Sequence, residues 1–333
     1  MATALAGLFS LRWTNPPTLH PLPDHISRSY VSTPGGPLEL LYASPSQKSN
    51  AENKKYPVLF VHGGYGRATV WLEWMTVLSQ KHNFPCYAIS LRGHGASYDP
   101  GYFSTLFSTT TAAMMDDLVA AIHEVEIREG QKCILAGHSA GGGMVQGVLD
   151  QNLAVARALV LVAAIPNFGS MGIYSNWFRL DPWFLVRSCF HLQHPRSPLS
   201  HPSLVHRAFF SAECPMSVAE DFSHWMPKYE SVRWPGGMAS RFVDVHRVLA
   251  NILGGGDGGR IKVLIMAGEK DKMVSLDLVT QTAAEYRQGV SESKGSEDRG
   301  IEMTITPGAG HHLQNDVQRD EGAEQLAAFL ERL

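Results

Sequence analysis

The chain has 333 residues, of which 44% are hydrophobic and 18% charged, a balance typical of a globular protein with a substantial buried core. The formal net charge of -3 and the scattered lysines and arginines argue against a polyanion-binding surface, so we expect no nucleic-acid partner. Four cysteines without Cys-x-x-Cys spacing indicate a reducing compartment and a cytoplasmic protein. No apolar run approaches the ~18 residues of a membrane-spanning helix, so we expect no stable membrane insertion.

The first part of the chain predicts an extended arm followed by a hairpin. Residues 1–25 form the expected N-terminal arm, because four prolines within residues 16–23 favour extended backbone. Residues 26–31 and 38–43 flank Pro34-Gly35-Gly36-Pro37, a pattern typical of two strands joined by a tight turn. The continuous apolar run at residues 56–61 indicates a strand buried on both faces of a sheet.

Strand and helix patterns then alternate. Strands are expected at residues 86–90, 133–136 and 158–163, and helices at residues 69–81, at residues 111–128 and directly after Ser139. Such alternation with short loops is typical of a parallel, doubly wound sheet with right-handed crossovers. Residues 26–165 are therefore predicted to form the first part of an α/β core.

The alternation breaks over residues 166–253. This segment holds 14 of the chain's 31 aromatic residues, and apolar spacings such as those at residues 217–226 predict a mostly helical insertion. The glycine-rich run at residues 254–259 lacks the Lys-Ser/Thr of a phosphate-binding loop, so we interpret it as a hinge. Residues 254–333 complete the core, with strands at 261–267 and 301–306, helices at 276–287 and 320–332, and a polar loop at 288–300.

One serine lies between a predicted strand and a predicted helix, in the motif Gly137-His138-Ser139-Ala140-Gly141. A Cβ on either flanking glycine would collide in so tight a turn, and the turn would hold the serine hydroxyl at the edge of the sheet. This five-residue motif alone is equally compatible with the glycine-rich N-terminus of an ordinary helix.

A serine hydroxyl needs a base within hydrogen-bond reach and a third group that orients the base. Loops that follow later parallel strands reach the same edge of the sheet as the serine. Two such loops, residues 268–274 and 308–311, supply Asp271 and His311. The candidate order along the chain is therefore Ser139, Asp271, His311.

The chain resembles the α/β-hydrolases of the esterase and lipase-like superfamily over nearly all of residues 26–333. The resemblance rests on five motifs in the family order: His62-Gly63-Gly64, Arg92-Gly93-His94-Gly95-Ala96-Ser97, Gly137-His138-Ser139-Ala140-Gly141, Gly268-x-x-Asp271-x-x-Val274 and Gly308-Ala309-Gly310-His311. It implies the α/β-hydrolase fold, a doubly wound and mostly parallel sheet with a helical cap insertion. Residues 166–253 would form that cap.

The resemblance also implies roles for individual residues. Ser139 would be the nucleophile, His311 the general base and later general acid, and Asp271 the carboxylate that orients the imidazole. The oxyanion hole would use the backbone N–H groups of Gly64 and Ala140. No cofactor and no metal are implied.

Two of these assignments have a rival next to them. Glu269 shares the loop of Asp271, and His312 adjoins His311. The family pattern places the acid three residues after the glycine and the histidine directly after the glycine, which favours Asp271 and His311.

Other polar residues have a structural interpretation. His62 and His94 are expected to make backbone hydrogen bonds near the site, and Arg92 is expected to anchor its loop. His191 and His194 have a metal-like spacing, but no carboxylate or cysteine clusters with them, so we interpret them as packed or solvated histidines.

The aromatic, sparsely charged insertion favours a hydrophobic small-molecule substrate. The leading hypothesis is a serine hydrolase that cleaves a carboxylic ester or lactone through an acyl-enzyme. Two alternatives stay open: a thioesterase, acyltransferase or carbon–carbon bond hydrolase of a small-molecule biosynthetic pathway, and a non-catalytic ligand-binding protein. Tyr65 occupies the position of a proline in prolyl aminopeptidases, which argues against peptidase activity. The sequence does not indicate an oligomeric state.

Overall fold

The computed structural model describes residues 9, 11, 19–47, 54–192, 194–228, 230–231, 233–253, 262–294 and 300–333. Its core is one eight-stranded sheet with the strand order β1-β2-β4-β3-β5-β6-β7-β8. The strands are β1 (Ile26–Thr33), β2 (Gly36–Ala43), β3 (Val58–Val61), β4 (Cys86–Ile89), β5 (Ile134–His138), β6 (Ala158–Val162), β7 (Val263–Gly268) and β8 (Ile301–Thr306). β2 runs antiparallel to β1 and β4, and the other neighbours are parallel, which confirms the predicted doubly wound, mostly parallel sheet.

The N-terminal hairpin is tighter than the sequence pattern suggested. Thr33 pairs with Gly36, so that only Pro34 and Gly35 form the loop, and each strand is two residues longer at the turn than expected. The hydroxyl of Thr33 donates a hydrogen bond to the carbonyl oxygen of Gly36 at 2.6 Å, which stabilises the turn.

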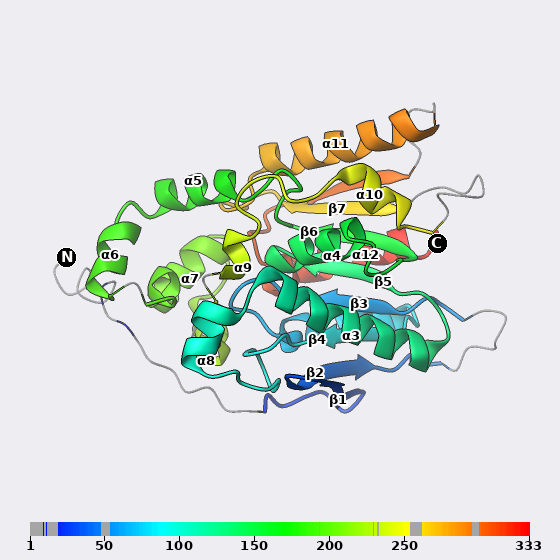
Figure 1. Cartoon of the computed structure of the whole chain (residues 1–333), viewed down its shortest axis with the longest axis horizontal. Helices are drawn as coiled ribbons and strands as arrows, with labels where there is room; N and C mark the ends of the chain where they lie inside the picture. The colour runs from blue at the N-terminus through cyan, green and yellow to red at the C-terminus, as the bar shows by residue number, and fades with distance from the viewer. Residues whose placement is uncertain are drawn as a thin grey trace.

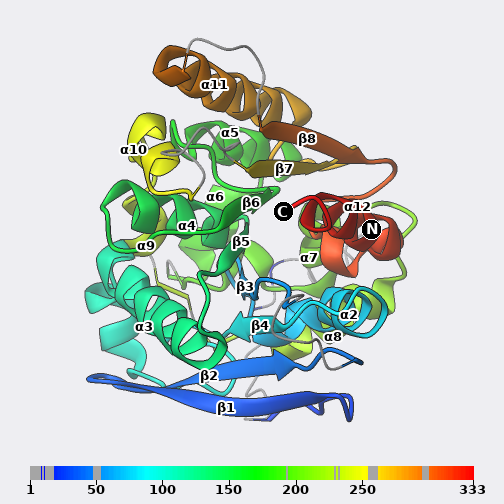
Figure 2. The same cartoon turned by 90° about the vertical axis from the view of Figure 1, so that its right-hand side faces the viewer.

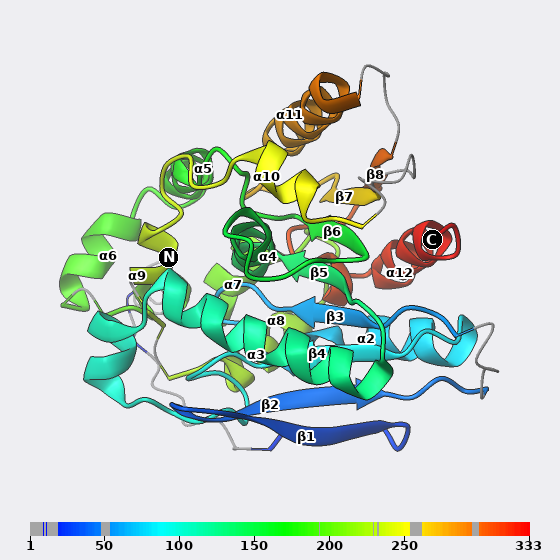
Figure 3. The same cartoon turned by 45° about the vertical axis from the view of Figure 1, so that its right-hand side comes forward.

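The central strands are covered on both faces. All residues of β3, β5 and β6 are buried, as their continuous apolar sequences predict for strands between two helical layers. Helices α3 (Thr111–Glu129), α4 (Ala140–Asp150) and α10 (Val245–Ala250) lie on one face, while α2 (Leu72–Thr76) and α12 (Arg319–Leu330) lie on the other (Figures 2 and 3). α2 is extended by the turns η2 (Ala68–Trp71) and η3 (Val77–Lys81).

The chain between β6 and β7 forms a group of helices outside the sheet. These are α5 (Met171–Leu180), α6 (Phe184–Phe190), α7 (Pro202–Phe209), α8 (Met216–Trp225) and α9 (Arg233–Gly236), with the short turn η5 (Ser197–Leu199), before α10 returns to the core. Figure 1 shows α5 to α8 gathered beyond one end of the sheet, with α6 farthest from it. None of the helices in the described ranges is long and apolar enough to cross a membrane.

The predicted end of the helix at residues 276–287 is wrong. α11 (Leu276–Lys294) continues through residues 288–294, where a polar loop was expected. Val290 is buried, and a Cβ added to Gly289 would lie 3.0 Å from side-chain atoms of Leu249 and Val245 in α10. The glycine therefore permits the close approach of two helices and does not end α11. The expected hinge at residues 254–259 and most of the N-terminal arm lie outside the described residues.

Candidate active site

Ser139 occupies a sharp turn between β5 and α4. Its backbone has φ 51° and ψ -120°, a region that costs a non-glycine residue of order 1–3 kcal/mol. A Cβ on Gly137 would lie 2.5 Å from the carbonyl oxygen of Gly141, and a Cβ on Gly141 would overlap the carbonyl oxygen of His62. Both glycines are thus required by their surroundings, for the steric reason expected from the sequence.

The structure brings the three candidate side chains into one hydrogen-bonded line. Nε2 of His311, in the loop after β8, lies 3.1 Å from Oγ of Ser139, and its Nδ1 lies 2.8 Å from Oδ2 of Asp271, in the loop after β7. Because a carboxylate only accepts hydrogen bonds, Nδ1 carries the proton and Nε2 is left to accept one from the serine. Such a line can deprotonate a hydroxyl and stabilise the resulting imidazolium.

The carboxylate of Asp271 is held on its other side as well. Its Oδ1 accepts hydrogen bonds from the backbone N–H groups of Met273 at 2.7 Å and Val274 at 2.9 Å. The side chain of Asp271 is 0% exposed and that of His311 is 3% exposed, so water does not compete for their hydrogen bond. The loop therefore fixes both the position and the orientation of the acid.

The rival residues lie elsewhere. Oε2 of Glu269 accepts the N–H of Gly308 at 2.8 Å, and this hydrogen bond lowers the pKa of Glu269, which is paired with Lys270 at the surface. His312 is buried, its Nδ1 lies 3.1 Å from Nδ2 of Asn315, and burial holds its pKa well below the usual value. Neither rival bonds to the serine.

The loop after β3 packs directly on the serine. A Cβ on Gly63 would lie 2.8 Å from Cβ of Ser139, so only glycine fits there. The N–H of Ala140 begins α4 and has no acceptor within the helix. Within the described ranges, neither this N–H nor that of Gly64 donates a hydrogen bond, and both residues line a cavity together with Ser139. Both groups are available to a substrate oxygen.

His62 stabilises the same loop as a neutral imidazole. Its Nδ1 donates to the carbonyl oxygen of Gly63 at 2.8 Å, and its Nε2 accepts the N–H of Leu91 at 3.1 Å. Burial holds the pKa of His62 well below its usual value.

Tyr65, the next residue of the loop after Gly64, is clamped from the inserted segment. Its φ is 61°, an uncommon conformation for a tyrosine. The N–H of Tyr65 donates to Oε2 of Glu230 at 2.8 Å, and its hydroxyl donates to the carbonyl oxygen of Pro195 at 2.5 Å. Two contacts from residues between β6 and β7 thus hold the backbone adjacent to the candidate oxyanion hole.

Glu230 forms a buried ion pair with His94. Oε2 of Glu230 lies 3.0 Å from Nε2 of His94, whose Nδ1 donates to the carbonyl oxygen of Arg92 at 2.9 Å. Since both ring nitrogens face acceptors, His94 carries two protons. Burial opposes this charge most strongly, but the Glu230 carboxylate, the carbonyl oxygen of Arg92 and Asp117 together raise the pKa of His94. Burial likewise opposes the charge on Glu230, but His94 and the N–H donors lower its pKa.

The structure adds two residues to which the sequence analysis assigned no role. Glu230 lies 136 positions from His94, and an isolated glutamate in an aromatic segment carries no local signal of this pairing. His138 lies within the serine motif itself, and its Nε2 donates to the carbonyl oxygen of His311 at 2.9 Å. This bond ties the histidine loop to β5.

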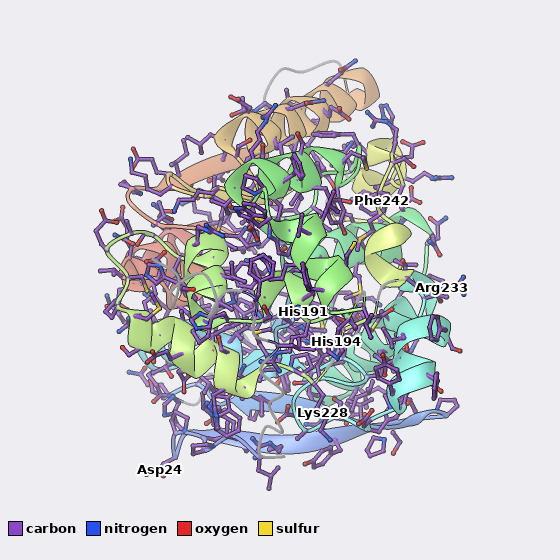
Figure 4. The ribbon with its side chains drawn as sticks, turned by 90° about the vertical axis from the view of Figure 1, so that its left-hand side faces the viewer. Asp24, His191, His194, Lys228, Arg233 and Phe242 are labelled. Carbon is purple, nitrogen blue, oxygen red and sulfur yellow. The ribbon has the colours of Figure 1, made fainter. Side chains whose placement is uncertain are left out.

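The remaining sequence candidates lie outside the Ser139–His311–Asp271 line. Nε and Nη2 of Arg92 bind the carboxylate of Asp117 at 2.8 and 2.6 Å, which anchors the loop as expected. Figure 4 shows His191 and His194 close together on the α6 side of the molecule. The ring nitrogens of His191 lie 3.0 Å from Oγ of Ser197 and 2.8 Å from the carbonyl oxygen of Phe9. No group of three or more potential metal ligands occurs in the part of the chain that the structure describes.

A cavity of about 290 Å³ opens above Ser139. Its floor contains Ser139, His311, Gly64 and Ala140, and its walls are mainly apolar side chains of the inserted segment, among them Ile173, Tyr174, Trp177, Phe184 and Phe209. The buried hydroxyl of Ser170 also lines it and has no hydrogen-bond partner among the described residues. The cavity suits an uncharged, mainly apolar ligand with few polar groups.

The chain is similar to known proteins over most of its length. Residues 58–328 match the Alpha/beta hydrolase family. Similar solved structures include an esterase from Thermogutta terrifontis, with a TM-score of 0.62 and 19% identity over 92% of this chain and 98% of that one. Carboxylesterase CesB from Bacillus subtilis has a TM-score of 0.61 and 17% identity over 99% and 96% of the two chains. Monoglyceride lipase from Saccharomyces cerevisiae has a TM-score of 0.62 and 14% identity over 95% and 98%.

Comparison with the curated proteins gives no significant match. Structural likeness at such low identity establishes a shared fold and leaves the substrate open. The family match, in contrast, spans most of the chain and includes the loops that carry Ser139, Asp271 and His311. This chain therefore belongs to the Alpha/beta hydrolase family.

Proposed function

We propose that the protein is a serine hydrolase that cleaves a carboxylic ester or lactone of a hydrophobic small molecule through an acyl-enzyme. The observation that carries the proposal is the line Ser139–His311–Asp271, with contacts of 3.1 and 2.8 Å, at the floor of an apolar cavity. A receptor would not need such a line, so a non-catalytic role is disfavoured. The helices within residues 166–253 would act as the cap, and the reducing cytoplasm would be the working compartment.

The proposed reaction begins when Oγ of Ser139 attacks the carbonyl carbon and its proton passes to Nε2 of His311. The negative charge that develops on the carbonyl oxygen is stabilised by the N–H groups of Gly64 and Ala140. Asp271 stabilises the imidazolium. His311 then gives the proton to the leaving alkoxide as the carbon–oxygen bond breaks, and the alcohol departs or, in a lactone, stays tethered to the acyl group.

Water completes the cycle. It attacks the acyl-enzyme while His311 accepts one of its protons, and the second tetrahedral intermediate collapses to the free acid as the proton returns to Oγ of Ser139. The line of hydrogen bonds is the same at the start and at the end. No other group needs to change its protonation state.

The cavity supports a preference within the ester class. A volume of about 290 Å³ is at the lower end of ligand pockets, and most lining side chains are aromatic or aliphatic. We therefore expect uncharged esters with a short or compact acyl group to react faster than long-chain or anionic esters. Thioester release, acyl transfer and carbon–carbon cleavage would use the same three side chains and need to be separated by experiment.

Turnover of p-nitrophenyl acetate, butyrate and palmitate, an acyl thioester and a 1,3-diketone tests the proposal. The short p-nitrophenyl esters should give the highest kcat/KM, and Ser139→Ala should reduce it by a factor on the order of 10⁵ or more. Ser170→Ala is the matched control, because it removes another hydroxyl from the same cavity and should leave kcat nearly unchanged. Ester turnover below that of the thioester or diketone would contradict the ester assignment.

A further inference from the structure

A second cavity, of about 160 Å³, shares no lining residue with the first. It lies where the start of η2, helix α8 and the segment before β1 meet, and Arg67, Thr69, His20, Asp221 and Phe222 contribute to its wall. A water molecule occupies ~30 Å³ in the liquid, so the space holds several waters or one small ion. None of the residues proposed above for catalysis lies in this wall.

Arg67 is a buried cation whose guanidinium makes no hydrogen bond to the residues that the structure describes. It is 5% exposed, and its Nε and Nη1 are shielded from solvent. Within the described ranges its guanidinium makes no ion pair, and its recorded contact is with the ring of Trp225, 5.6 Å from the ring centre. Burial lowers the pKa of Arg67 to about 10, so the group stays charged at neutral pH. Buried charges normally have a partner, because leaving them unpaired is costly.

Thr69 repeats this pattern two residues later. Its side chain lines the same cavity, the residue is 6% exposed, and its hydroxyl is buried without a hydrogen-bond partner in the described part of the chain. Two side chains with unsatisfied donors, one of them charged, therefore belong to residues that line one small space. Their complement is a ligand that is negatively charged and offers more than one acceptor oxygen.

The carboxylates near this cavity do not fulfil that role. Asp221 and Glu73 line it, but both are exposed, and neither lies within ion-pair distance of Arg67. Glu73 is 3.8 Å from Arg319 instead. The charge of Asp221 acts on Arg67 from farther away, and it would also oppose an anion that enters the cavity.

We propose that this cavity binds a small oxyanion, a carboxylate or a phosphate group, through the guanidinium of Arg67 and the hydroxyl of Thr69. A guanidinium presents several N–H donors in a plane and suits the oxygens of either group. The bound anion would neutralise the buried charge at the start of η2. This inference stands independently of the proposed hydrolysis.

Thermal unfolding of the whole chain in sodium phosphate, sodium acetate and sodium chloride at equal ionic strength tests the proposal. Phosphate or acetate should raise Tm saturably above the value in chloride, by about 2 °C at ten times Kd. The anion with the lower Kd identifies the tetrahedral or the planar group as the better ligand. An equal Tm in all three salts would overturn the proposal.

Variants locate the effect. Arg67→Gln should abolish the anion-dependent rise in Tm. Thr69→Val should increase Kd several-fold, and it serves as the test if Arg67→Gln does not fold. Arg241→Gln, which removes an arginine with a 57% exposed side chain, should respond like the wild type. An unchanged response in the Arg67 and Thr69 variants would place the anion elsewhere and refute the assignment.

Asp221→Asn tests whether a bound anion or the carboxylate of Asp221 balances the charge of Arg67. If the cavity binds an anion, removing the neighbouring negative charge should lower Kd. If Asp221 is instead the partner of Arg67 in solution, the substitution should lower Tm in chloride, and no salt should restore it. The second result would overturn the proposal.

Discussion

Glu230→Gln is the most informative single substitution, because it keeps the shape of the side chain and removes its charge. The carboxylate accepts three hydrogen bonds: from Tyr65 N–H at 2.8 Å and His94 at 3.0 Å on Oε2, and from Ser231 N–H at 2.9 Å on Oε1. A glutamine has one acceptor oxygen. Its NH₂ group must therefore face at least one of these donors, whichever way the amide is turned.

The cost follows from these contacts. Removing one partner of a buried ion pair costs about 3–5 kcal/mol, and His94 recovers part of this by releasing its proton. We expect a loss of about 3 kcal/mol in unfolding free energy, or on the order of 4 °C in Tm for a chain of this length. Because Tyr65 N–H exchanges a charged carboxylate for a neutral amide, its hydrogen bond weakens, and the adjacent Gly64 should shift. Complete loss of an oxyanion donor costs 10²–10³ in rate, so a shift should lower kcat by roughly 10–100-fold.

Steady-state kinetics with p-nitrophenyl acetate measure this effect, together with Tm at the same pH. The loss should fall on kcat, with KM changed less than about threefold, because the contact matters most when charge develops on the substrate oxygen. Glu124→Gln is the control, since its ion pair with Arg128 lies at the surface and should be worth only ~0.3–0.5 kcal/mol. A kcat for Glu230→Gln within twofold of wild type would refute the claim that Glu230 holds the Tyr65 backbone for catalysis.

Three further predictions concern the site and its frame. Asp271→Asn should lower kcat by on the order of 10⁴ while Glu269→Gln stays near wild type, and comparable losses in both variants would mean that the acid is misassigned. Gly141→Ala should destabilise the protein by at least ~1–3 kcal/mol in urea unfolding, because its Cβ would overlap two backbone carbonyl oxygens; an unchanged midpoint would contradict the packing. The raised pKa of His94 adds stability below its ordinary value of 6.5 that is lost as pH rises through the raised pKa. The lowered pKa of Glu230 adds stability above its ordinary value of 4.5 that is lost as pH falls. The Tm difference between wild type and Glu230→Gln should therefore be largest between pH 4.5 and 6.5 and shrink towards pH 9, whereas a difference that grows with pH would contradict the ion pair.

The three catalytic candidates could be predicted from the sequence because each lies in a short sequence pattern that has a physical cause. Ser139 needs glycines on both sides of a tight turn, and Asp271 and His311 lie in the loops after the two predicted strands at residues 261–267 and 301–306. Parallel strands bring such loops to one edge of a sheet. The order of elements and the fold class therefore followed from patterns within short windows.

The features that sequence reasoning missed depend on contacts between distant segments. Residues 288–300 were expected to form a polar loop, whereas α11 continues to Lys294 and Gly289 lets α10 approach it. The pairing of Glu230 with His94 and the isolation of Arg67 depend on what the rest of the chain places around them. Neither residue type nor spacing distinguishes such a buried charge from a solvated one.

The most direct test of the central claim is the site of covalent labelling by a fluorophosphonate, which reacts with activated serines. Intact-mass and peptide analysis should find one adduct, on Ser139, in the wild type, no adduct in Ser139→Ala, and much slower labelling in His311→Ala. Equal labelling of wild type and Ser139→Ala, or labelling of Ser139 at an unchanged rate without His311, would contradict the proposed nucleophile and its base.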